Sequence, residues 1–306
     1  MRVISYNSNE SLNINASTVT ALGFFDGVHI GHRELIKRAV LLSQRMGLVP
    51  TVFTFSSGDE AIKSNSSRIY QDSEKYRIFE SLGIELVVTA EFSSMKDMPR
   101  EVFVKDFLFK TLGTRVAVVG KDFRFGKGAT GNADYLGEVM NSLGADTVAL
   151  DMETVNIDGI EREVSSTLIR TLLGRGQVSL AGELLGEPYH IVGRVEHGRG
   201  EGRGFGYPTV NISLQNNSPL ANGVYHTTVK IGEKLYTGLT NVGVCPSFKE
   251  RERHTETFIL DFDGDAYGKE VHLLFIDFIR EERVFSSAEE LGREIERNIA
   301  EIKRKI

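Results

Sequence analysis

The sequence predicts two folded parts: an α/β domain with a parallel sheet, then an all-β domain built as a six-stranded antiparallel barrel with a C-terminal helix. Two observations carry this prediction. Up to about residue 186, short apolar runs alternate with helical stretches, which is typical of a parallel sheet covered on both faces. Beyond it, short segments alternate apolar and polar residues without helices between them, which indicates antiparallel strands. The length of 306 residues also fits about two domains.

The elements of the first domain follow in order. A strand is predicted over 19–22 and a helix over 31–46, whose apolar face is formed by Leu35, Ala39, Leu42 and Met46. Further strands are predicted over 48–55, 85–89, 115–119 and 147–150, with helices over 74–82, 100–112 and 135–143. Because ligands bind at the carboxyl ends of parallel strands, this edge of the sheet is where a site is expected.

The end of the first domain is marked by a small hairpin and two short helices. The hairpin is predicted over 154–164 with Asp158 and Gly159 in its turn, since Asp-Gly tolerates the positive φ of a tight hairpin. Helices over 166–174 and 178–185 follow. Gly186-Glu187-Pro188 then predicts a boundary between a domain of residues 1–186 and a domain of residues 187–306.

The second domain has six candidate strands and a closing helix. The strands are predicted over 189–196, 207–213, 223–231, 235–244, 255–262 and 270–279. Ser286 and Glu289 are spaced as a capping box at the start of the helix. The helix is expected to pack on the barrel through an apolar stripe of Leu291, Ile295, Ile299, Ile302 and Ile306.

Composition and charge exclude several classes of protein. With 36 basic and 42 acidic residues the net charge is −6, which argues against a nucleic-acid binder with a generic basic surface. The single cysteine, Cys245, cannot by itself form an intrachain disulfide or a thiolate zinc site. No apolar run approaches the roughly 18 residues of a membrane span, and the N-terminus has no signal-peptide core, so a cytoplasmic protein is expected.

The segment from Gly23 to His32, which joins the first strand to the first helix, predicts a phosphate site. A helix N-terminus offers free N–H groups and a positive dipole end. His29 and His32 add ring N–H donors, and Gly31 lets a phosphate approach the backbone. A tight turn with two exposed histidines, or half of a metal site, is the alternative. The metal interpretation is weak, because few other ligands lie at suitable spacing.

Two features of the second domain also bear on chemistry. Residues 197–206 hold five glycines in ten positions, and such a loop with arginines either cradles phosphate through backbone N–H groups or is simply flexible. Glu256 is expected to share its side of a strand with Phe258 and Leu260, where a carboxylate needs a partner or a function. A solvated strand position is the alternative. The acidic stretch 263–268 is predicted to be a turn, not a calcium loop.

The string Phe25-Asp26-Gly27-Val28-His29-Ile30-Gly31-His32 resembles the FMN adenylyltransferase module of bacterial bifunctional riboflavin kinase/FAD synthetases, and its His-x-Gly-His part resembles the nucleotidylyltransferase signature. Residues 119–132 resemble the second motif of the family, and residues 164–170 resemble the superfamily's Ser-Ser-Thr-x-x-Arg motif. The resemblance implies a Rossmann-like nucleotidylyltransferase domain. In it, the histidines bind the triphosphate of ATP and stabilise charge while the α-phosphate is attacked. The implied ATP-binding residues are Gly23, Phe25, Asp26, His29, Gly31, His32, Ser166, Thr167 and Arg170, and the implied second-motif residues are Asp122, Phe123, Phe125, Gly126 and Lys127.

The second domain resembles the riboflavin kinase of the same family. The signature, usually Pro-Thr-Ala-Asn, is present with Val210 in place of Ala, and residues 241–248, 256–262 and 278–282 resemble further segments of that kinase. The implied ATP-binding residues are Gly202, Arg203, Gly206, Tyr207, Pro208, Thr209 and Asn211. Of these, Thr209 and Asn211 would also hold Mg²⁺, as hard oxygen donors do. Glu256 would be the catalytic base that accepts the proton of the ribityl hydroxyl, and Glu256 and Arg280 would contact the flavin.

Together the resemblances imply a bifunctional transferase of flavin-cofactor biosynthesis. It would phosphorylate riboflavin to FMN with ATP, and adenylylate FMN to FAD with release of pyrophosphate. The implied partners are riboflavin, FMN, ATP and Mg²⁺, without nucleic acid or membrane, in a monomer or weak homo-oligomer. The stretch from Ser56 to Asp59 departs from the acidic residue and Pro-His-Pro of the family. A monofunctional riboflavin kinase with one degenerate domain and a flavin-binding regulator are therefore the alternatives.

Overall fold

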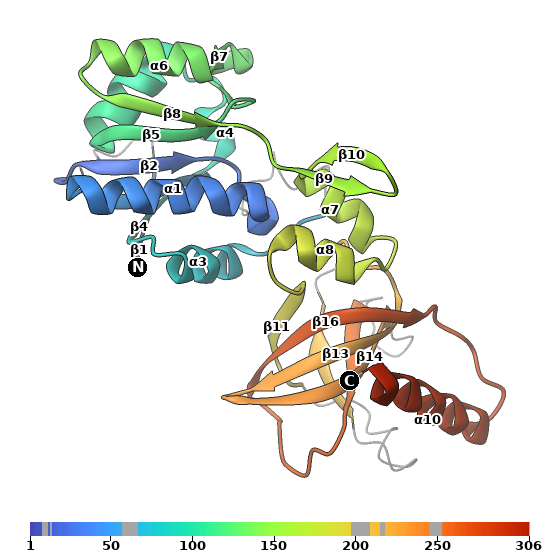
Figure 1. Cartoon of the computed structure of the whole chain (residues 1–306). Coiled ribbons are helices and arrows are strands. Elements are labelled where there is room, and N and C mark those ends of the chain that lie inside the picture. Colours follow the sequence, from blue (N-terminus) through green and yellow to red (C-terminus); the bar gives the residue numbers. More distant parts are fainter. Residues whose placement is uncertain are drawn as a thin grey trace. The chain divides into compact units, whose positions relative to one another are not determined.

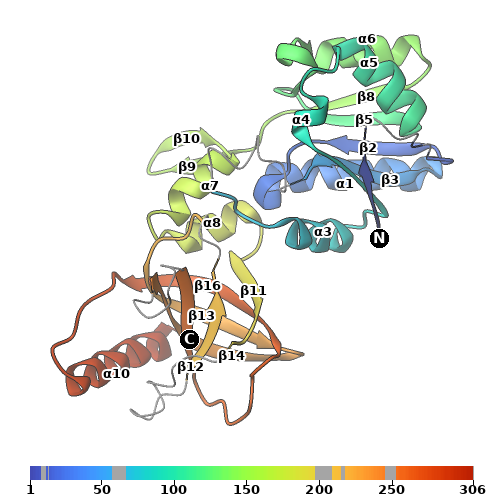
Figure 2. The same cartoon turned by 180° about the vertical axis from the view of Figure 1, so that it is seen from behind.

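The computed structural model describes residues 1–7, 12, 14–56, 67–196, 209–214, 218–244 and 253–305. The chain divides into two compact units, Met1–Ser166 and Thr167–Ile306, both visible in Figures 1 and 2. The predicted fold class is confirmed, because the first unit holds a six-stranded parallel sheet and the second a six-stranded antiparallel one.

The parallel sheet of the first unit has one strand that the sequence did not predict. Its order is β1 (Arg2–Tyr6), β4 (Leu86–Ala90), β3 (Val49–Phe55), β2 (Thr18–Leu22), β5 (Thr114–Gly120) and β8 (Asp146–Leu150). The unpredicted strand is β1, which pairs with β4 from Arg2 opposite Leu86 to Tyr6 opposite Ala90. It is an edge strand with largely exposed side chains, so a buried apolar run, the signal that marked the other strands, is missing there.

Helices cover both faces of this sheet. α1 (Ile30–Met46) packs on β2, β3 and β5, and α3 (Asp72–Ser81) lies beyond β3 in the chain. The stripe predicted for α1 is partly wrong, since its fully buried residues are Leu35, Ile36, Ala39 and Ser43, whereas Met46 is 50% exposed. The buried face is centred nearer Ile36 and Ser43, and Met46 lies in the last turn, next to the left-handed cap at Gly47.

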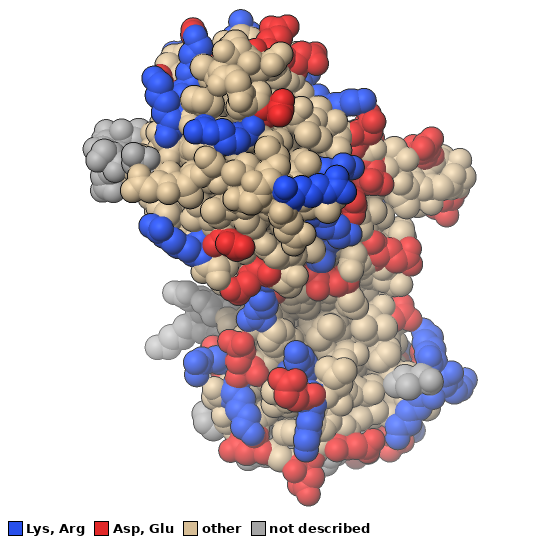
Figure 3. All heavy atoms as spheres, turned by 60° about the vertical axis from the view of Figure 1, so that its left-hand side comes forward, with Lys and Arg blue, Asp and Glu red and all other residues tan. Residues whose placement is uncertain are grey.

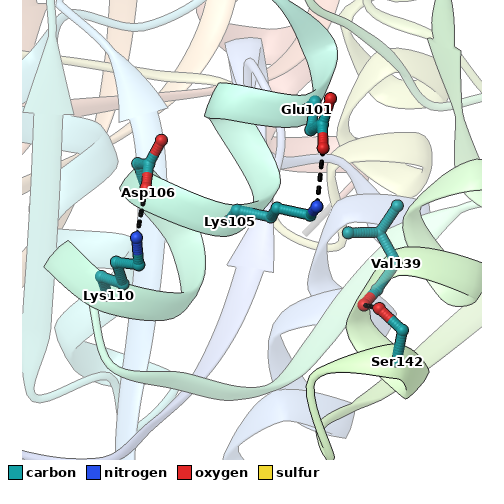
Figure 4. A network of polar contacts seen from close by, with 6 residues as sticks. All are labelled: Glu101, Lys105, Asp106, Lys110, Val139 and Ser142. Carbon is teal, nitrogen blue, oxygen red and sulfur yellow. Dashed lines mark hydrogen bonds and ion pairs between the residues drawn. The ribbon is translucent and has the colours of Figure 1, made fainter.

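The opposite face is covered by α6 (Ala133–Ser142) and by a helix that is largely of π type. α5 (Arg100–Val102) continues into η2 (Phe103–Thr111), a nine-residue π-helix that occupies the helix predicted over 100–112. On its exposed side, Lys105 pairs with Glu101 at 2.6 Å and Lys110 with Asp106 at 2.7 Å (Figure 4). In α6 nearby, the Ser142 hydroxyl donates to the Val139 carbonyl. The buried residues of η2 are Phe103, Val104, Phe107 and Leu108.

Small elements complete the first unit. They are η1 (Asp26–Val28), α4 (Phe92–Met95), β6 (Arg124–Phe125), η3 (Lys127–Ala129), β7 (Gly131–Asn132), β9 (Thr154–Ile157) and β10 (Ile160–Glu163). β9 and β10 form the predicted hairpin, and its turn residues Asp158 and Gly159 have φ of 53° and 82°. The Asp-Gly pair thus occupies the left-handed conformations that predicted the turn.

The second unit begins with α7 (Ser166–Leu173), whose first residue ends the first unit, and α8 (Val178–Leu185), which packs on β16. Its sheet has the order β11 (His190–Arg194), β16 (Glu270–Arg280), β13 (Gly223–Ile231), β14 (Lys234–Val244), β15 (Arg253–Ile259) and β12 (Thr209–Ser213). Beyond β11, the N–H of Glu196 donates to the carbonyl of Asn211 in β12, at 2.9 Å. This bridge joins the two edge strands, so the sheet nearly closes into the predicted barrel.

The closing helix packs on the barrel as predicted, but its cap lies one residue further on. Helix α10 (Ala288–Lys305) contributes Ile302, Ile295 and Ile299 to a cluster with Val224 and Leu239. The predicted box of Ser286 and Glu289 is wrong. Because the helix begins at Ala288, Ser287 is its N-cap: its hydroxyl accepts from the N–H of Glu290, whose carboxylate accepts from the N–H of Ser286 at 2.9 Å.

Charged side chains of both signs lie among one another on the face drawn in Figure 3. This distribution agrees with the slightly acidic composition, and the face shows no extended basic surface of the kind that tracks a nucleic-acid backbone. Among the described residues, no helix is long and apolar enough to cross a membrane.

Candidate nucleotide and flavin sites

The loop between β2 and α1 has a strained backbone at the carboxyl edge of the sheet. Phe25 and Val28 adopt positive φ of 50° and 44°, which is costly for a bulky and a β-branched residue. Gly27 lies between them at φ 78°, and a Cβ there would come within 2.8 Å of Ile69. Strain of this kind persists only where surrounding contacts enforce it, and it is concentrated at functional sites.

Hydrogen bonds that involve side chains tie this loop to its surroundings. Asp26 is bound twice: its carboxylate accepts from the N–H of Ile69 at 3.1 Å, and its carbonyl accepts from the Ser166 hydroxyl at 2.8 Å. The Thr54 hydroxyl donates to the carbonyl of Phe24, and Arg33 donates to that of Val28. Asp26 and Ser166 therefore have structural partners within the first unit, and their roles towards ATP stay predictions.

His29 and His32 form a stacked pair at the start of α1. Their ring centroids lie 3.6 Å apart with planes inclined by 21°, and Nδ1 of His29 accepts from the N–H of His32 as the helix N-cap. With Nδ1 accepting, the proton of a neutral His29 is assigned to Nε2, so the ring keeps one N–H donor. Burial lowers the pKa of His29 to about 4. The pKa of His32 is also lowered well below its ordinary value, first by burial, then by the charges of His29 and Lys75.

These shifts predict acid sensitivity of the first unit. Because His29 has a pKa of about 4 folded and about 6.5 unfolded, the unfolded chain binds its proton first, and stability falls as the pH drops from about 6.5 towards 4. The loss for His29 alone is roughly 3 kcal/mol. His29→Asn keeps a good N-cap without a titratable ring and should lose less stability over this range. Hydrogen exchange of the α1 amides between pH 7 and 4.5 measures the stability of the first unit in both proteins. If stability depends on pH in the same way in the parent protein and in His29→Asn, the prediction is wrong.

The second motif of the first unit forms a folded turn after β5. Phe125 is 7% exposed, with its ring centroid 5.0 Å from Phe103 and 5.5 Å from Phe123. Gly126 has φ 75°, and a Cβ there would lie 2.8 Å from Arg100, so no side chain fits. Lys127 pairs with Asp97 at 3.4 Å on the surface. Packing thus explains Phe125 and Gly126, while the ligand roles of Asp122, Phe123 and Lys127 stay predictions.

Thr167 and Arg170 come together in the first turns of α7. An Arg170 guanidinium N–H donates to the Thr167 hydroxyl at 3.1 Å. This contact confirms that the two side chains share one face of the helix. Their role towards ATP stays a prediction, as do those of Gly23 and Gly31. A Cβ at Gly23 would meet the Phe25 ring at 2.9 Å, whereas one at Gly31 would be 3.4 Å from the ring of His29.

In the barrel, three strands bring polar side chains to one place. Asn211 of β12 and Asn241 of β14 both stand opposite Glu256 of β15 in the strand register. The Thr209 hydroxyl donates to Oε1 of Glu256 at 2.8 Å. Thr255, Thr257 and Ile259 point to the buried side of β15, so the half-buried Glu256 lies on the other face with Phe258. Leu260, expected beside Glu256, lies beyond the end of the strand.

Arg280, the last residue of β16, is tied to α10. Its Nε donates to Oδ1 of Asn298 at 3.1 Å and lies 3.3 Å from Oε1 of Glu294. Sequence reasoning missed both partners, although Glu294 is 9% and Asn298 1% exposed. Glu294 and Asn298 are four residues apart on the helix that follows Arg280, so they share one helix face. This spacing was the signal from which the sequence could have predicted the two partners. The flavin contact of Arg280 stays a prediction.

Some predicted residues lie outside the described ranges. They are Gly202, Arg203, Gly206, Tyr207 and Pro208 of the kinase loop, 57–59 of the departing loop, and 245–248 with Cys245. Within the described residues, no group of three or more His, Cys, Asp or Glu side chains could hold a metal ion.

Comparisons with known proteins match the whole length of the chain. A FAD synthetase family model matches residues 11–168 and a riboflavin kinase family model residues 185–306. A Buchnera aphidicola (Schizaphis graminum) protein named bifunctional riboflavin kinase/FMN adenylyltransferase is 31% identical, covering 95% of each chain, and a Bacillus subtilis protein of that name is 31% identical over 92% of this chain and 90% of its own. A Streptococcus pneumoniae structure titled macrolide-efflux protein is 28% identical with a TM-score of 0.86, covering 99% of both chains.

Proposed function

The chain belongs to the bifunctional riboflavin kinase/FMN adenylyltransferase family, and from this premise we propose which residues carry its two activities. It phosphorylates riboflavin to FMN and adenylylates FMN to FAD, with ATP as the donor in both reactions. We assign FAD formation to the loop of His29 and His32 and FMN formation to the barrel site of Glu256. The strained loop that ends in the stacked histidine pair is the observation that carries the first assignment.

In FAD formation, a phosphate oxygen of FMN attacks the α-phosphorus of ATP. A new P–O bond forms, the bond to the β-phosphate bridging oxygen breaks, and its electron pair leaves with pyrophosphate. Catalysis here rests on positioning and on charge stabilisation, without a covalent intermediate. The N-terminus of α1 and the N–H donor of neutral His29 suit the polyphosphate, which gathers negative charge in this step.

Aromatic side chains at the same sheet edge support a flavin pocket. Phe24 follows β2, Phe55 ends β3 and Phe92 follows β4, with centroids 5.5 Å apart from Phe24 to Phe55 and 5.3 Å from Phe55 to Phe92. Phe24 is 40% and Phe92 37% exposed, unusual for such large apolar groups. The planar apolar isoalloxazine of FMN is the part of the substrate that such rings would bind.

In FMN formation, the ribityl 5′-hydroxyl of riboflavin attacks the γ-phosphorus of ATP, and ADP leaves with the electron pair of the broken bond. Glu256 accepts the hydroxyl proton as general base. Its hydrogen bond from Thr209 fixes one carboxylate oxygen, and we assign the other to the substrate hydroxyl. Oxygen donors of Thr209 and Asn211 fit Mg²⁺, which is held by few protein oxygens together with phosphates. Mg²⁺ would neutralise phosphate charge there.

A time course of one incubation tests the assignment of both activities. Purified protein with riboflavin, Mg²⁺ and ATP should convert riboflavin first into FMN and then into FAD, with pyrophosphate released in the second step. FMN that accumulates without FAD would support the alternative of a monofunctional kinase. Riboflavin that stays unchanged while it binds would support a flavin-binding regulator.

We also propose that residues 187–306 form the kinase domain. This fragment should make FMN, but it should be less stable than residues 167–306, because it lacks α8, whose Val178, Leu184 and Leu185 are buried. α8 packs on β16, so the loss is expected to be a few kcal/mol. Urea unfolding of both fragments, with FMN formation as the functional measure, checks this. Equal stability would show that α8 contributes nothing to the barrel, and an inactive shorter fragment would move the boundary towards residue 167.

A further inference from the structure

Lys75, on the first turns of α3, is a buried cation without an assigned role. Its residue exposure is 2%, whereas lysines are rarely buried unless they are paired. Its ammonium lies 3.0 Å from Asp72, whose side chain is 20% exposed, and 3.5 Å from the carbonyl of Phe55. That carbonyl is the last of β3, so the ammonium stands at the carboxyl edge of the parallel sheet, where ligands bind.

The same side of α3 packs against the histidine loop. Phe79, one helical turn beyond Lys75, has its ring centroid 5.6 Å from that of Phe25, edge to face. The Phe25 ring in turn lies 5.1 Å from the His32 ring. Burial lowers the pKa of His32 most, and the charges of His29 and then of Lys75 add to this effect. The titratable groups whose charges act on His32 are thus His29, the N-cap of α1, and Lys75 of α3, whose ion-pair partner is Asp72.

We propose that Lys75 is a positioning residue of the adenylyl-transfer site: its fixed positive charge, held at the carboxyl edge of the sheet beside the histidine loop, stabilises the polyphosphate. The proposal rests on the assignment of FAD formation to His29 and His32. Because both histidine rings are neutral, another residue must supply positive charge to the site. Lys75 is a buried cation next to the histidine loop. As the bond to pyrophosphate breaks, negative charge grows on the leaving group, so a nearby cation in a water-poor site favours the transition state.

Three variants and one control separate this role from a structural ion pair. Lys75→Met keeps the length without the charge, Lys75→Arg keeps the charge, and Asp72→Asn removes the counter-ion only. Lys105→Met breaks an exposed ion pair of η2 in the same unit and is the matched control. The measurements are kcat and KM for ATP in FAD formation from supplied FMN between pH 5.5 and 8.5, with FMN formation by the barrel as an internal standard.

Lys75→Met is expected to lower kcat for FAD formation by roughly tenfold to a hundredfold, with FMN formation unchanged. Without the cation, His32 protonates at higher pH, so the variant should lose activity on the acid side where the parent protein does not. Lys75→Arg and Asp72→Asn should retain most of the rate and the parental pH profile. Lys105→Met should match the parent protein.

Normal kcat and pH profile in Lys75→Met would overturn the proposal. The proposal would also be overturned if Asp72→Asn or Lys75→Arg lowered kcat for FAD formation as much as Lys75→Met does, because the ion pair would then have a structural role. Should Lys75→Met unfold the first unit, Asp72→Asn decides: a loss of kcat for FAD formation of roughly tenfold or more in the folded Asp72→Asn protein would overturn the proposal, and a retained rate in both Asp72→Asn and Lys75→Arg would support it. The assignment of FAD formation to the histidine loop is tested separately. If His29→Ala still forms FAD, that assignment is wrong. If His29→Ala abolishes FAD formation and Lys75→Met does not, only the role proposed for Lys75 is wrong.

Discussion

Glu256→Gln is expected to remove most FMN formation, with a loss of roughly 10²–10⁴ in rate. Gln keeps the side-chain volume and one acceptor oxygen for the Thr209 hydroxyl, but it cannot accept a proton at neutral pH. The fold and ATP binding should therefore persist. Thr209→Ala and Asn211→Ala should instead raise KM for Mg²⁺-ATP, because they remove oxygen donors beside Glu256. Steady-state kinetics of FMN formation measure all three.

The matched control is Glu233→Gln, an exposed carboxylate between β13 and β14 of the same barrel. It should leave FMN formation unchanged, and all four variants should still make FAD from supplied FMN. Near-normal phosphorylation of riboflavin by Glu256→Gln would rule out the general base and leave Glu256 as a positioning or structural carboxylate.

His29→Ala or His32→Ala should abolish FAD formation while FMN accumulates. Loss of one donor that stabilises developing charge costs on the order of 10²–10³ in rate. For His29 the N-cap of α1 is lost as well, at about 1 kcal/mol, so His29→Asn distinguishes loss of the ring from loss of the cap. His272→Ala, a half-buried histidine of the barrel strand β16, is the control and should make both products. An equal fall of FMN formation in the folded His29→Ala protein would contradict two separate sites.

Periodicity predicted the longer helices and strands of both units, because the apolar residues that form each of these elements also face its core. It failed at β1, where an exposed edge strand has no buried face to mark it, and at the cap of α10, where Ser286 and Ser287 both have a glutamate three residues on. Motifs predicted the roles of His29, Thr209 and Glu256. The sequence did not single out Lys75 and Asn298, because contacts across the fold and not a local pattern distinguish them.

The loop of Phe25 to Val28 shows another limit of sequence reasoning. Its string of residues indicated phosphate binding, yet positive φ at a phenylalanine and a valine is disfavoured by local propensity. Contacts from elsewhere in the fold, among them those of Asp26 with Ile69 and Ser166, hold this conformation. Likewise, the neutral state of the histidine pair follows from burial, which residue identity alone does not predict.

The central claim is that two independent sites, one in each unit, work in succession. Mixing Glu256→Gln with His29→Ala tests it most directly, with riboflavin, Mg²⁺ and ATP as the only substrates. Alone, the first variant should release almost no FMN and the second should stop at FMN. Together they should make FAD, because FMN released by the second is adenylylated by the first. A mixture that makes no FAD, although Glu256→Gln converts added FMN, would contradict free transfer between the two sites, and FAD formation by His29→Ala alone would contradict the assignment itself.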